Sequence, residues 1–316
     1  MSTKSTPAHP ITNDLAAFHA HLTASPAPGI LALLGAGLSA SSGLPTFRGA
    51  GGLWRTHDST SLATPGAFAA DPGLVWQFYS YRRHMALTVQ PNPAHYALAE
   101  LARKPERGRA LAARGAPRGQ LQLLHGTLFE VRCVDRQGCG YEGENFTDPI
   151  VPALAIPTSG EDPTSDSARE ASAQQSPGRD LDISDIATPI PHLLPPELPI
   201  CPKCKAKLLR PGVVWFGEAL PTSVLDKVDA FINPPSSSDN HKIDLIMVIG
   251  TSAKVYPAAG YITAARRKGA RVCVVNVDEE DRPPGGWREG DFFFQGDAAV
   301  LVPKMLEPVI GELGAQ

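Results

Sequence analysis

The stretch from Leu31 to Arg48, LALLGAGLSASSGLPTFR, decides the predicted fold. Its first residues continue an apolar run, 30–34, that does not alternate, which is typical of a parallel strand buried on both faces. Gly35 and Gly37 follow the strand and allow the backbone to turn tightly and approach a pyrophosphate. Two such glycines are weak evidence alone, because the same turn forms where a strand only packs closely on a helix. The stretch indicates a dinucleotide site, with close strand–helix packing as the simpler alternative.

The longer pattern is more specific than its glycines. GAGxSxxSGxPxFR, from Gly35 to Arg48, resembles the signature of the sirtuins, the family of NAD-dependent protein deacylases. It departs from the dehydrogenase fingerprint GxGxxG, because Ala40 occupies the place of the third glycine. Further blocks follow in the family's order: LLHGTLFEVRC at 123–133, RPGVVWFGE at 210–218, IMVIGTSAKVYPAA at 246–259 and VCVVNVD at 272–278. The resemblance covers about residues 27–302.

The fold class follows from the buried strands and from this resemblance. The apolar runs at 30–34, 246–249 and 272–276 predict an α/β fold with a doubly wound, parallel, Rossmann-like sheet, and the resemblance adds a small inserted zinc-ribbon domain. The expected organisation is an N-terminal extension at 1–26, a discontinuous NAD-binding domain at 27–125 and 210–310, and the zinc-ribbon domain at 126–209. Within the latter, residues 157–196 are rich in Ser, Pro, Asp and Ala, which predicts a disordered or loosely held insertion.

Composition limits the classes of function. A formal net charge of -3 over 316 residues argues against a general nucleic-acid binder, which needs an excess of Lys and Arg. No apolar run approaches the roughly 20 residues of a membrane span. The N-terminus has no arginine before Arg48 and carries Asp14, unlike a mitochondrial transit peptide. We therefore expect a cytoplasmic or nuclear protein, although the resemblance leaves a mitochondrial location open.

Four of the five cysteines form two pairs. Cys201 and Cys204 have the spacing of a zinc knuckle, and Cys133 and Cys139 precede them with a wider loop than the family's usual two to four residues. The alternatives are unligated thiols or a redox-active CxxC. We expect one structural Zn²⁺, because four cysteines close the coordination sphere. Cys273 lies in an apolar strand and is predicted to be a core residue.

The resemblance implies the site residues of an NAD-consuming enzyme. In the sirtuin mechanism the acyl-lysine oxygen attacks the ribose carbon that bears nicotinamide, and a base takes a proton from a ribose hydroxyl. His125, expected just after a strand at 121–124, would be that base, since imidazole titrates near neutral pH. A histidine at a strand end, taken alone, is more often structural. The implied cofactor-binding residues are Gly35, Ala36, Gly37, Ser39, Thr46, Phe47, Arg48, Gly250, Thr251, Ser252, Asn276, Asp278 and Ala298.

A second set of residues concerns the substrate, an acylated lysine of a protein. Tyr79 and Arg82 share a helix face and match the pair by which the desuccinylase, demalonylase and deglutarylase subgroup holds the acyl carboxylate. Ala63 matches a small pocket residue of that subgroup. The alternative is an exposed arginine and a packed tyrosine on an ordinary helix. Val214, Phe216 and Gly217 resemble the strand that pairs with the substrate backbone.

One block of the family's pattern is missing. Sirtuins carry a buried strand ending in Gln-Asn-x-Asp after the helix that we expect at 92–103, whereas residues 104–120 contain neither Asn nor Asp and no apolar run. We therefore expect no strand there. The sequence favours an NAD-dependent deacylase for succinyl, malonyl or glutaryl groups, which releases nicotinamide and O-acyl-ADP-ribose. The alternatives are a catalytically defective binding protein or truncated isoform, and a dehydrogenase, which the missing third glycine disfavours.

Overall fold

The computed structural model of the chain describes residues 12–25, 28–46, 52–103, 109–111, 120–158, 180–234 and 242–314. The chain folds into two compact units, which we take in turn. Unit 1 comprises residues 1–42, 90–124 and 221–316, and unit 2 comprises residues 43–89 and 125–220. Residues 43–89 therefore group with the smaller unit rather than with the NAD-binding domain in which we had expected them.

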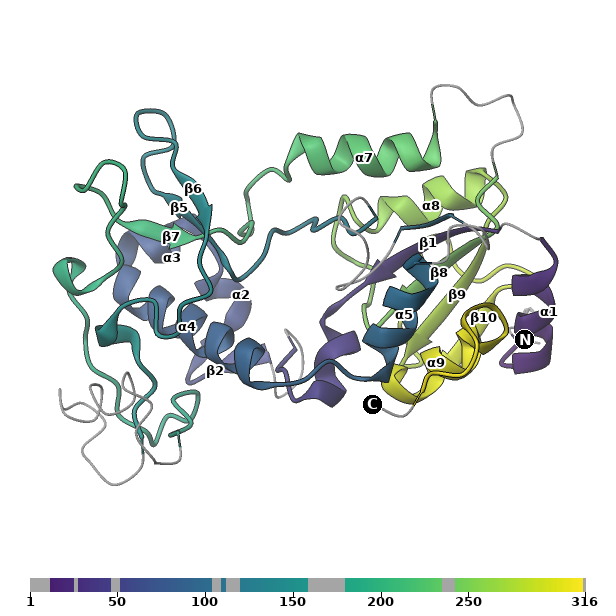
Figure 1. Ribbon diagram of the computed structural model, residues 1–316, viewed down its shortest axis with the longest axis horizontal. Coiled ribbons are helices and arrows are strands. Elements are labelled where there is room, and N and C mark those ends of the chain that lie inside the picture. The colour runs from purple at the N-terminus through teal and green to yellow at the C-terminus, as the bar shows by residue number, and fades with distance from the viewer. Residues whose placement is uncertain are drawn as a thin grey trace, which may run out of the picture. The chain divides into compact units, whose positions relative to one another are not determined.

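Unit 1 is built on a parallel sheet with the strand order β10-β9-β8-β1-β4, of which Figure 1 labels β10, β9, β8 and β1. The strands are β1 (Gly29–Leu34), β4 (Arg109–Leu111), β8 (Leu245–Ile249), β9 (Arg271–Asn276) and β10 (Phe292–Gln295). All five residues of β8 are buried, as its unbroken apolar run predicts for a strand covered on both faces. The three strands expected at 30–34, 246–249 and 272–276 are thus confirmed.

Helices cover both faces of this sheet (Figure 1). On one face α1 (Leu15–Thr23), α5 (Pro93–Arg103) and α9 (Ala298–Ile310) share an apolar core with the strands. On the other face α7 (Thr222–Ile232) and α8 (Gly260–Arg267) do the same. This is the doubly wound arrangement that the sequence predicts.

Two elements of unit 1 differ from our expectations. Residues 15–23 belong to the core rather than to an extension, since Phe18 is fully buried and its ring lies edge-on to Phe292 at 5.2 Å. β4 forms where we expected no strand, and it pairs in parallel with β1, with Arg109 opposite Gly29. An edge strand needs only backbone groups to extend a ladder, so a segment without an apolar run can supply one.

Unit 2 combines two short sheets and helices around a second apolar core. Its helices are α2 (Ser59–Leu62), α3 (Pro65–Ala70) and α4 (Pro72–Thr88). An antiparallel sheet has the order β6-β5-β7, formed by β5 (Glu130–Cys133), β6 (Glu142–Glu144) and β7 (Leu209–Pro211), and β2 (Leu53–Trp54) pairs with β3 (His57–Asp58). Single 3₁₀ turns lie at η4 (Pro152–Leu154) and η5 (Pro195–Glu197), and a longer one, η1 (Ala36–Ser42), follows β1 in unit 1.

The expectation of a loosely held insertion is wrong for residues 180–196, while 159–179 lie outside the described residues. Ile183 and Leu193 are buried in the core of unit 2. The Arg55 guanidinium donates hydrogen bonds to the carbonyls of Ile183, Asp185 and Thr188 at 2.8–3.1 Å. These bonds satisfy carbonyls that a segment without regular structure would otherwise leave unpaired.

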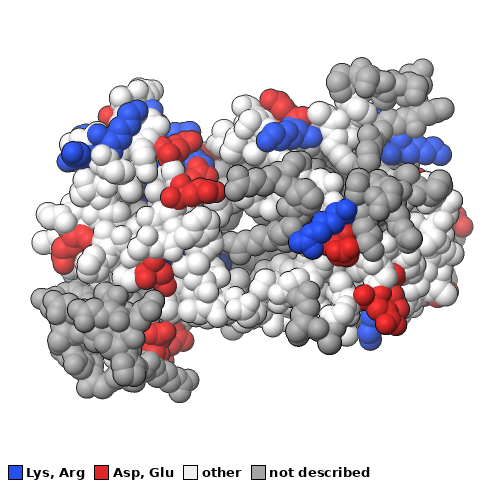
Figure 2. Space-filling model, in the orientation of Figure 1, with Lys and Arg blue, Asp and Glu red and all other residues white. Residues whose placement is uncertain are grey.

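Charges of both signs are interspersed among the described residues on the face that Figure 2 displays. The prediction against general nucleic-acid binding stays a prediction. Among the described helices, none is long and apolar enough to cross a membrane.

Candidate active site and cysteine cluster

Three glycines meet where β1 and β8 end at the same edge of the sheet of unit 1. The Gly35 N–H donates to the Ile249 carbonyl and the Gly37 N–H to the Gly250 carbonyl, both at 2.9 Å. A Cβ on Gly37 would lie 2.8 Å from the Gly250 Cα, and Gly250 itself has a φ of +61°. Side chains are therefore excluded from this junction, which lies at the carboxyl edge where doubly wound folds bind dinucleotides, so a ligand can approach the backbone closely there. The geometry fits NAD.

Polar side chains lie around this junction. The Ser39 hydroxyl is 3.1 Å from Nε2 of His95, whose Nδ1 accepts the Asn92 N–H at 3.2 Å. That contact at Nδ1 leaves the proton of a neutral His95 on Nε2, so the ring donates to Ser39. The Asn276 amide, at the end of β9, donates to the Thr251 carbonyl at 3.3 Å. The predicted residues thus lie in unit 1, Thr251 and Asn276 at the ends of β8 and β9 and Ser39 in the 3₁₀ helix η1 that follows β1.

The remaining predicted cofactor residues are distributed as follows. In unit 1, Ala36 begins η1, Ser252 is buried just after Thr251, Asp278 accepts the Glu280 N–H at 2.9 Å, and Ala298 begins α9. Thr46 falls in unit 2. Phe47 and Arg48 lie outside the described residues.

His125 lies in unit 2, and the strand expected before it does not form. Residues 121–124 are not buried on both faces, and Leu123 is 42% exposed, because Gln122 interrupts the run and a turn begins at Leu124. The His125 carbonyl accepts the Val214 N–H at 3.0 Å. The imidazole itself is reached by solvent, yet partial desolvation lowers its pKa from the usual 6.5. The neutral ring, which can accept a proton, is therefore favoured near pH 7.

The predicted acyl-binding residues come together within unit 2. Tyr79 and Arg82 lie one turn apart on α4; Tyr79 is 1% exposed, and burial raises its pKa to about 12. Arg82 donates to the Pro45 carbonyl at 3.2 Å, and burial lowers the pKa of its guanidinium. Ala63, buried at the end of α2, accepts the Phe216 N–H at 2.9 Å. The tyrosine is packed, as the simpler alternative proposes, but the arginine is not on an exposed surface.

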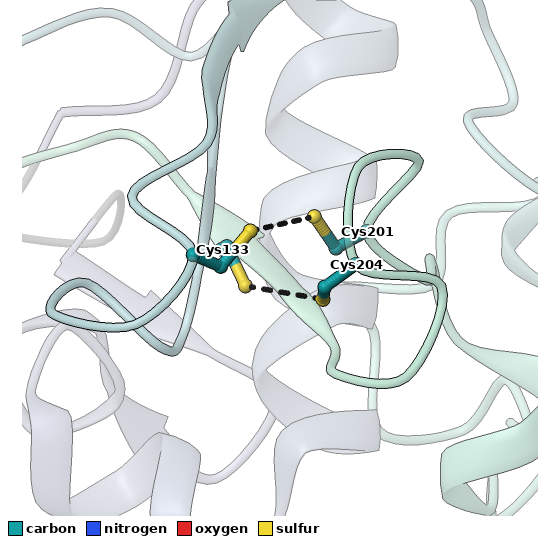
Figure 3. Close-up of side chains that lie close together, drawn as sticks. Cys133, Cys201 and Cys204 are labelled. Atoms are coloured by element: carbon teal, nitrogen blue, oxygen red, sulfur yellow. Dashed lines mark hydrogen bonds between the residues drawn. The ribbon is translucent and has the colours of Figure 1, made fainter.

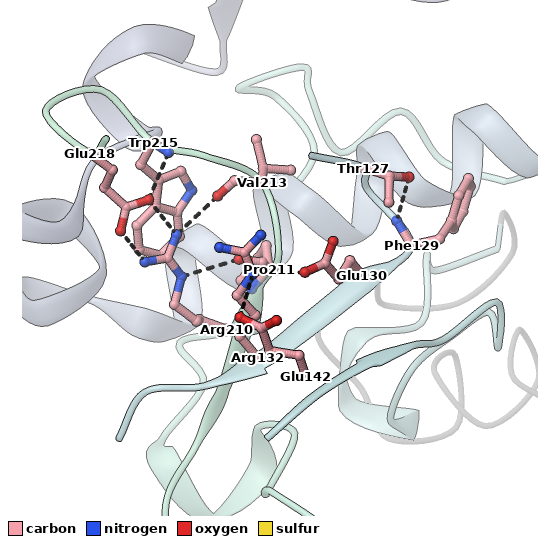
Figure 4. Close-up of polar contacts among 10 residues, drawn as sticks. All are labelled: Thr127, Phe129, Glu130, Arg132, Glu142, Arg210, Pro211, Val213, Trp215 and Glu218. Atoms are coloured by element: carbon pink, nitrogen blue, oxygen red, sulfur yellow. Dashed lines mark hydrogen bonds and ion pairs between the residues drawn. The ribbon is translucent and has the colours of Figure 1, made fainter. Parts of the chain in front are cut away.

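A loop after β7 joins these residues, and it contains functional candidates that the sequence analysis did not single out. The indole N–H of Trp215 donates to the Tyr79 hydroxyl at 2.9 Å. The Arg210 guanidinium forms a two-pronged ion pair with Glu218 at 2.5 and 2.9 Å and lies 3.4 Å from the centre of the Trp215 ring (Figure 4). The sequence signal was an arginine and a glutamate that bracket the loop 211–217 at its two ends.

The same loop modifies the expected role of Val214, Phe216 and Gly217. The N–H groups of Val214 and Phe216 bond inside unit 2, and the loop is not a strand in the described structure. A peptide backbone would therefore have to use other groups of the loop. Gly217 has a φ of +89°, a conformation that favours glycine, so it fixes the direction in which the loop turns.

The four cysteine sulfurs of Cys133, Cys139, Cys201 and Cys204 all lie within 4.8 Å of one another. Cys133 ends β5, Cys139 lies in the following turn, and Cys201 and Cys204 lie in the loop before β7 (Figure 3). The sulfur–sulfur distances are 3.9 Å for Cys133–Cys204 and 3.6 Å for Cys139–Cys201. Four thiolates at about 2.3 Å from a tetrahedral Zn²⁺ lie about 3.8 Å apart, so the cluster fits zinc. Cys273 is buried in β9, as predicted.

Comparison with known proteins agrees with this geometry. The model of the Sir2 family matches residues 35–257. An NAD-dependent protein deacylase of Candida albicans is 43% identical over 302 residues, covering 90% of this chain and 94% of the relative. The mitochondrial NAD-dependent protein deacylase sirtuin-5 of Canis lupus familiaris is 38% identical over 293 residues, covering 88% and 81%. The crystal structure of a Sir2 homologue–NAD complex, 30% identical, superposes with a TM-score of 0.65 over 95% of each chain.

A doubly wound sheet with a glycine junction at its carboxyl edge, together with a four-cysteine lobe, defines an NAD-binding protein with a structural zinc site. The chain belongs to the Sir2 family. The resemblance to sirtuins is thereby confirmed, and with it, at the level of the family, the class of NAD-consuming enzymes.

Proposed function

We propose that this protein removes acidic acyl groups, namely succinyl, malonyl and glutaryl, from lysine side chains of other proteins in an NAD-dependent reaction. NAD-dependent deacylation is supported by the family and by relatives that cover most of the chain. The preference for acidic acyl groups rests on one observation: a buried tyrosine and a largely desolvated arginine lie one turn apart on α4. The products would be nicotinamide, O-acyl-ADP-ribose and the free lysine.

The chemistry assigned to the chain's own residues is limited to binding, orientation and one proton transfer. NAD supplies the ribose carbon that the acyl oxygen attacks. Neutral His125 accepts a proton from a ribose hydroxyl, a role that its lowered pKa supports at physiological pH. Gly35, Gly37 and Gly250 keep side chains away from the edge of the sheet, where a pyrophosphate would approach the backbone closely. The zinc would hold the β5–β6 turn to the loop before β7 and take no part in the reaction.

Selection for an acidic acyl group follows from the cost of burying an arginine. Desolvation lowers the pKa of Arg82, which means that the surroundings disfavour its charge. A carboxylate bound there would add a charge-assisted hydrogen bond to the guanidinium, worth about 1.5–3 kcal/mol, whereas an acetyl group offers none. By the factor of ten per 1.4 kcal/mol, this gives a preference of about 10- to 150-fold. Ala63 leaves room for the longer chain because its side chain is a single methyl group.

The defective alternative rests on the missing Gln-Asn-x-Asp strand, and one part of that argument is weakened, because β4 supplies a strand that pairs with β1. The Gln-Asn-x-Asp motif remains absent from residues 104–120. The names of the relatives add nothing in favour of a protein without turnover.

The test is nicotinamide release from NAD, measured with a succinyl-lysine peptide and with its acetyl counterpart. Release should be faster with the succinyl peptide and should vanish in His125→Ala. Arg82→Met should lower kcat/KM for the succinyl peptide by about tenfold or more and leave the acetyl value nearly unchanged. Arg103→Met removes an exposed arginine of α5 and serves as the matched control. Equal rates on both peptides in the wild-type protein would refute the acidic preference.

The location in the cell is also part of the proposal. Several relatives are named as mitochondrial, among them the sirtuin-5 proteins of dog and Xenopus tropicalis, and this supports a mitochondrial location. The cytoplasmic or nuclear expectation from the N-terminus is untested. Fractionation of cells that produce the full chain would decide between them.

A further inference from the structure

Trp215, in the loop 211–217, forms a hydrogen bond with Tyr79, and the direction of this bond matters for the choice of substrate. Trp215 is 3% exposed, and its indole N–H can only donate, so the Tyr79 hydroxyl oxygen must be the acceptor in their 2.9 Å contact. A phenol has one proton and two acceptor lone pairs. With one lone pair taken by the indole, a phenol proton turned toward Trp215 would meet the indole proton. The Tyr79 proton therefore turns to the opposite side of its oxygen.

Two neighbouring side chains pack against the indole. The Arg210 guanidinium stacks on the ring at 3.4 Å, and the Phe68 ring lies 5.4 Å from it. Glu218 accepts the Trp215 backbone N–H at 2.8 Å while it pairs with Arg210. Figure 4 shows Arg210 bonded to Glu218 and to the Val213 carbonyl, with the indole beside the guanidinium.

The Arg210–Glu218 ion pair stays charged in the folded protein. Burial alone would raise the pKa of the Glu218 carboxyl, but Arg210 and the Trp215 N–H hold it below its usual range. The carboxyl therefore stays charged, and the two-pronged geometry fixes the guanidinium plane against the indole. Removal of either partner would leave a largely buried charge without its counterion, so the pair keeps the loop in a single conformation.

We propose that Trp215, held by the Arg210–Glu218 ion pair, is a positioning residue for acyl selection: it orients the Tyr79 hydroxyl as a donor toward the acyl carboxylate. The inference rests on the proposed preference for acidic acyl groups. A carboxylate only accepts hydrogen bonds, so it benefits from a hydroxyl whose proton is already directed away from the indole. An acetyl group has no carboxylate and gains nothing from that orientation.

Trp215→Phe tests this inference, because it removes the indole N–H and keeps an aromatic ring. We expect kcat/KM for a succinyl-lysine peptide to fall about tenfold, mainly through a higher KM, while the value for the acetyl peptide changes less than about twofold. Trp54→Phe is the matched control: Trp54 is buried in the same apolar core, and its N–H has no hydrogen-bond partner among the described residues. It should leave the succinyl-to-acetyl ratio unchanged.

A double-mutant cycle with Tyr79→Phe separates orientation from simple packing. If Trp215 acts through the phenol hydroxyl, Trp215→Phe should have no further effect on the ratio once that hydroxyl is gone. Trp215→Phe is used only if it retains zinc and melts cooperatively. If it does not, Glu218→Gln, which weakens the Arg210–Glu218 ion pair, replaces it in the double-mutant cycle with Tyr79→Phe.

The outcomes distinguish this inference from the proposed function. If wild-type protein does not prefer the succinyl peptide, the proposed function fails and this inference fails with it. If wild-type protein prefers it and Trp215→Phe keeps the same ratio, lowers both activities equally, or adds fully to Tyr79→Phe, only the positioning role is overturned. A ratio that falls in Trp215→Phe alone, with no further loss in the double variant, supports the role.

Discussion

At the scale of single residues, His125 shows how the environment adjusts a side chain for its role. Its pKa is lowered from 6.5 by partial desolvation. A general base works in its neutral form, so a lowered pKa extends the pH range in which His125 can accept a proton.

The expected pH profile follows from this direction. We predict that kcat/KM for the succinyl peptide falls toward acid pH with a midpoint below 6.5, approaching tenfold per pH unit below the His125 pKa. The measurement is initial nicotinamide release at saturating NAD between pH 5 and 9, with intact folding verified at each pH. A decline centred above pH 7 would contradict His125 as a base with a lowered pKa.

At the scale of elements, the sequence predicted what depends on neighbouring residues. The run at 245–249 is apolar throughout, and a strand covered on both faces requires no more than that. The spacing of Cys201 and Cys204 likewise indicated a metal knuckle before any distance was known.

What the sequence could not predict depends on distant partners. Residues 180–196 look like a polar insertion, but they are ordered by Arg55, which is about 130 positions earlier in the chain. Trp215 reaches Tyr79 across 136 positions. A local sequence pattern cannot predict such hydrogen bonds, because their partners are far apart in the chain and come together only in the folded protein. β4 was missed for a related reason, since its support is the backbone of β1.

The β6-β5-β7 sheet carries the next prediction. Its strands have only three or four residues each, which is marginal without a further constraint, so the cysteine cluster at one end is expected to supply it. Cys201→Ser should lose the bound zinc and lower the melting temperature of the protein. Cys273→Ala, which changes a buried cysteine outside the cluster, should keep one zinc per chain. Zinc content by elemental analysis, with thermal melts, checks both; full zinc retention in Cys201→Ser would contradict the site.

At the scale of the whole molecule, the functional residues are divided between the two units. The glycine junction and the strand-end polar residues belong to unit 1, while His125, the acyl-binding residues and the zinc cluster belong to unit 2. A change that unfolds unit 2 should therefore abolish turnover even though it leaves every residue of the glycine junction unaltered. For this reason, variants of unit 2 need a stability measurement beside their activity.

Stability itself should depend on pH through histidines shifted in opposite directions. In unit 2, His84 on α4 contacts Asp148 at 2.7 Å and Asp180 at 3.0 Å, and the hydrogen bond to Asp148 is the main cause that raises its pKa above 6.5. A raised pKa means that the charged pair stabilises the folded protein fully below pH 6.5, and that this contribution is lost as pH rises through the folded pKa. The lowered pKa of His125 acts in the opposite sense, because its neutral form is favoured and stability falls as acid protonates it.

The charge on His84 can be tested by replacing it with glutamine, which keeps polar atoms but cannot be protonated. His84→Gln should lower the melting temperature by a few degrees at pH 5.5 and by less at pH 8.5, because wild-type His84 loses its charge as pH rises through its pKa. His192→Gln, an exposed position in the same unit, controls for the loss of a histidine as such. If the difference between His84→Gln and wild type were the same at both pH values, His84 would contribute through packing or neutral hydrogen bonds, and its charge would play no part in joining α4 to residues 148 and 180.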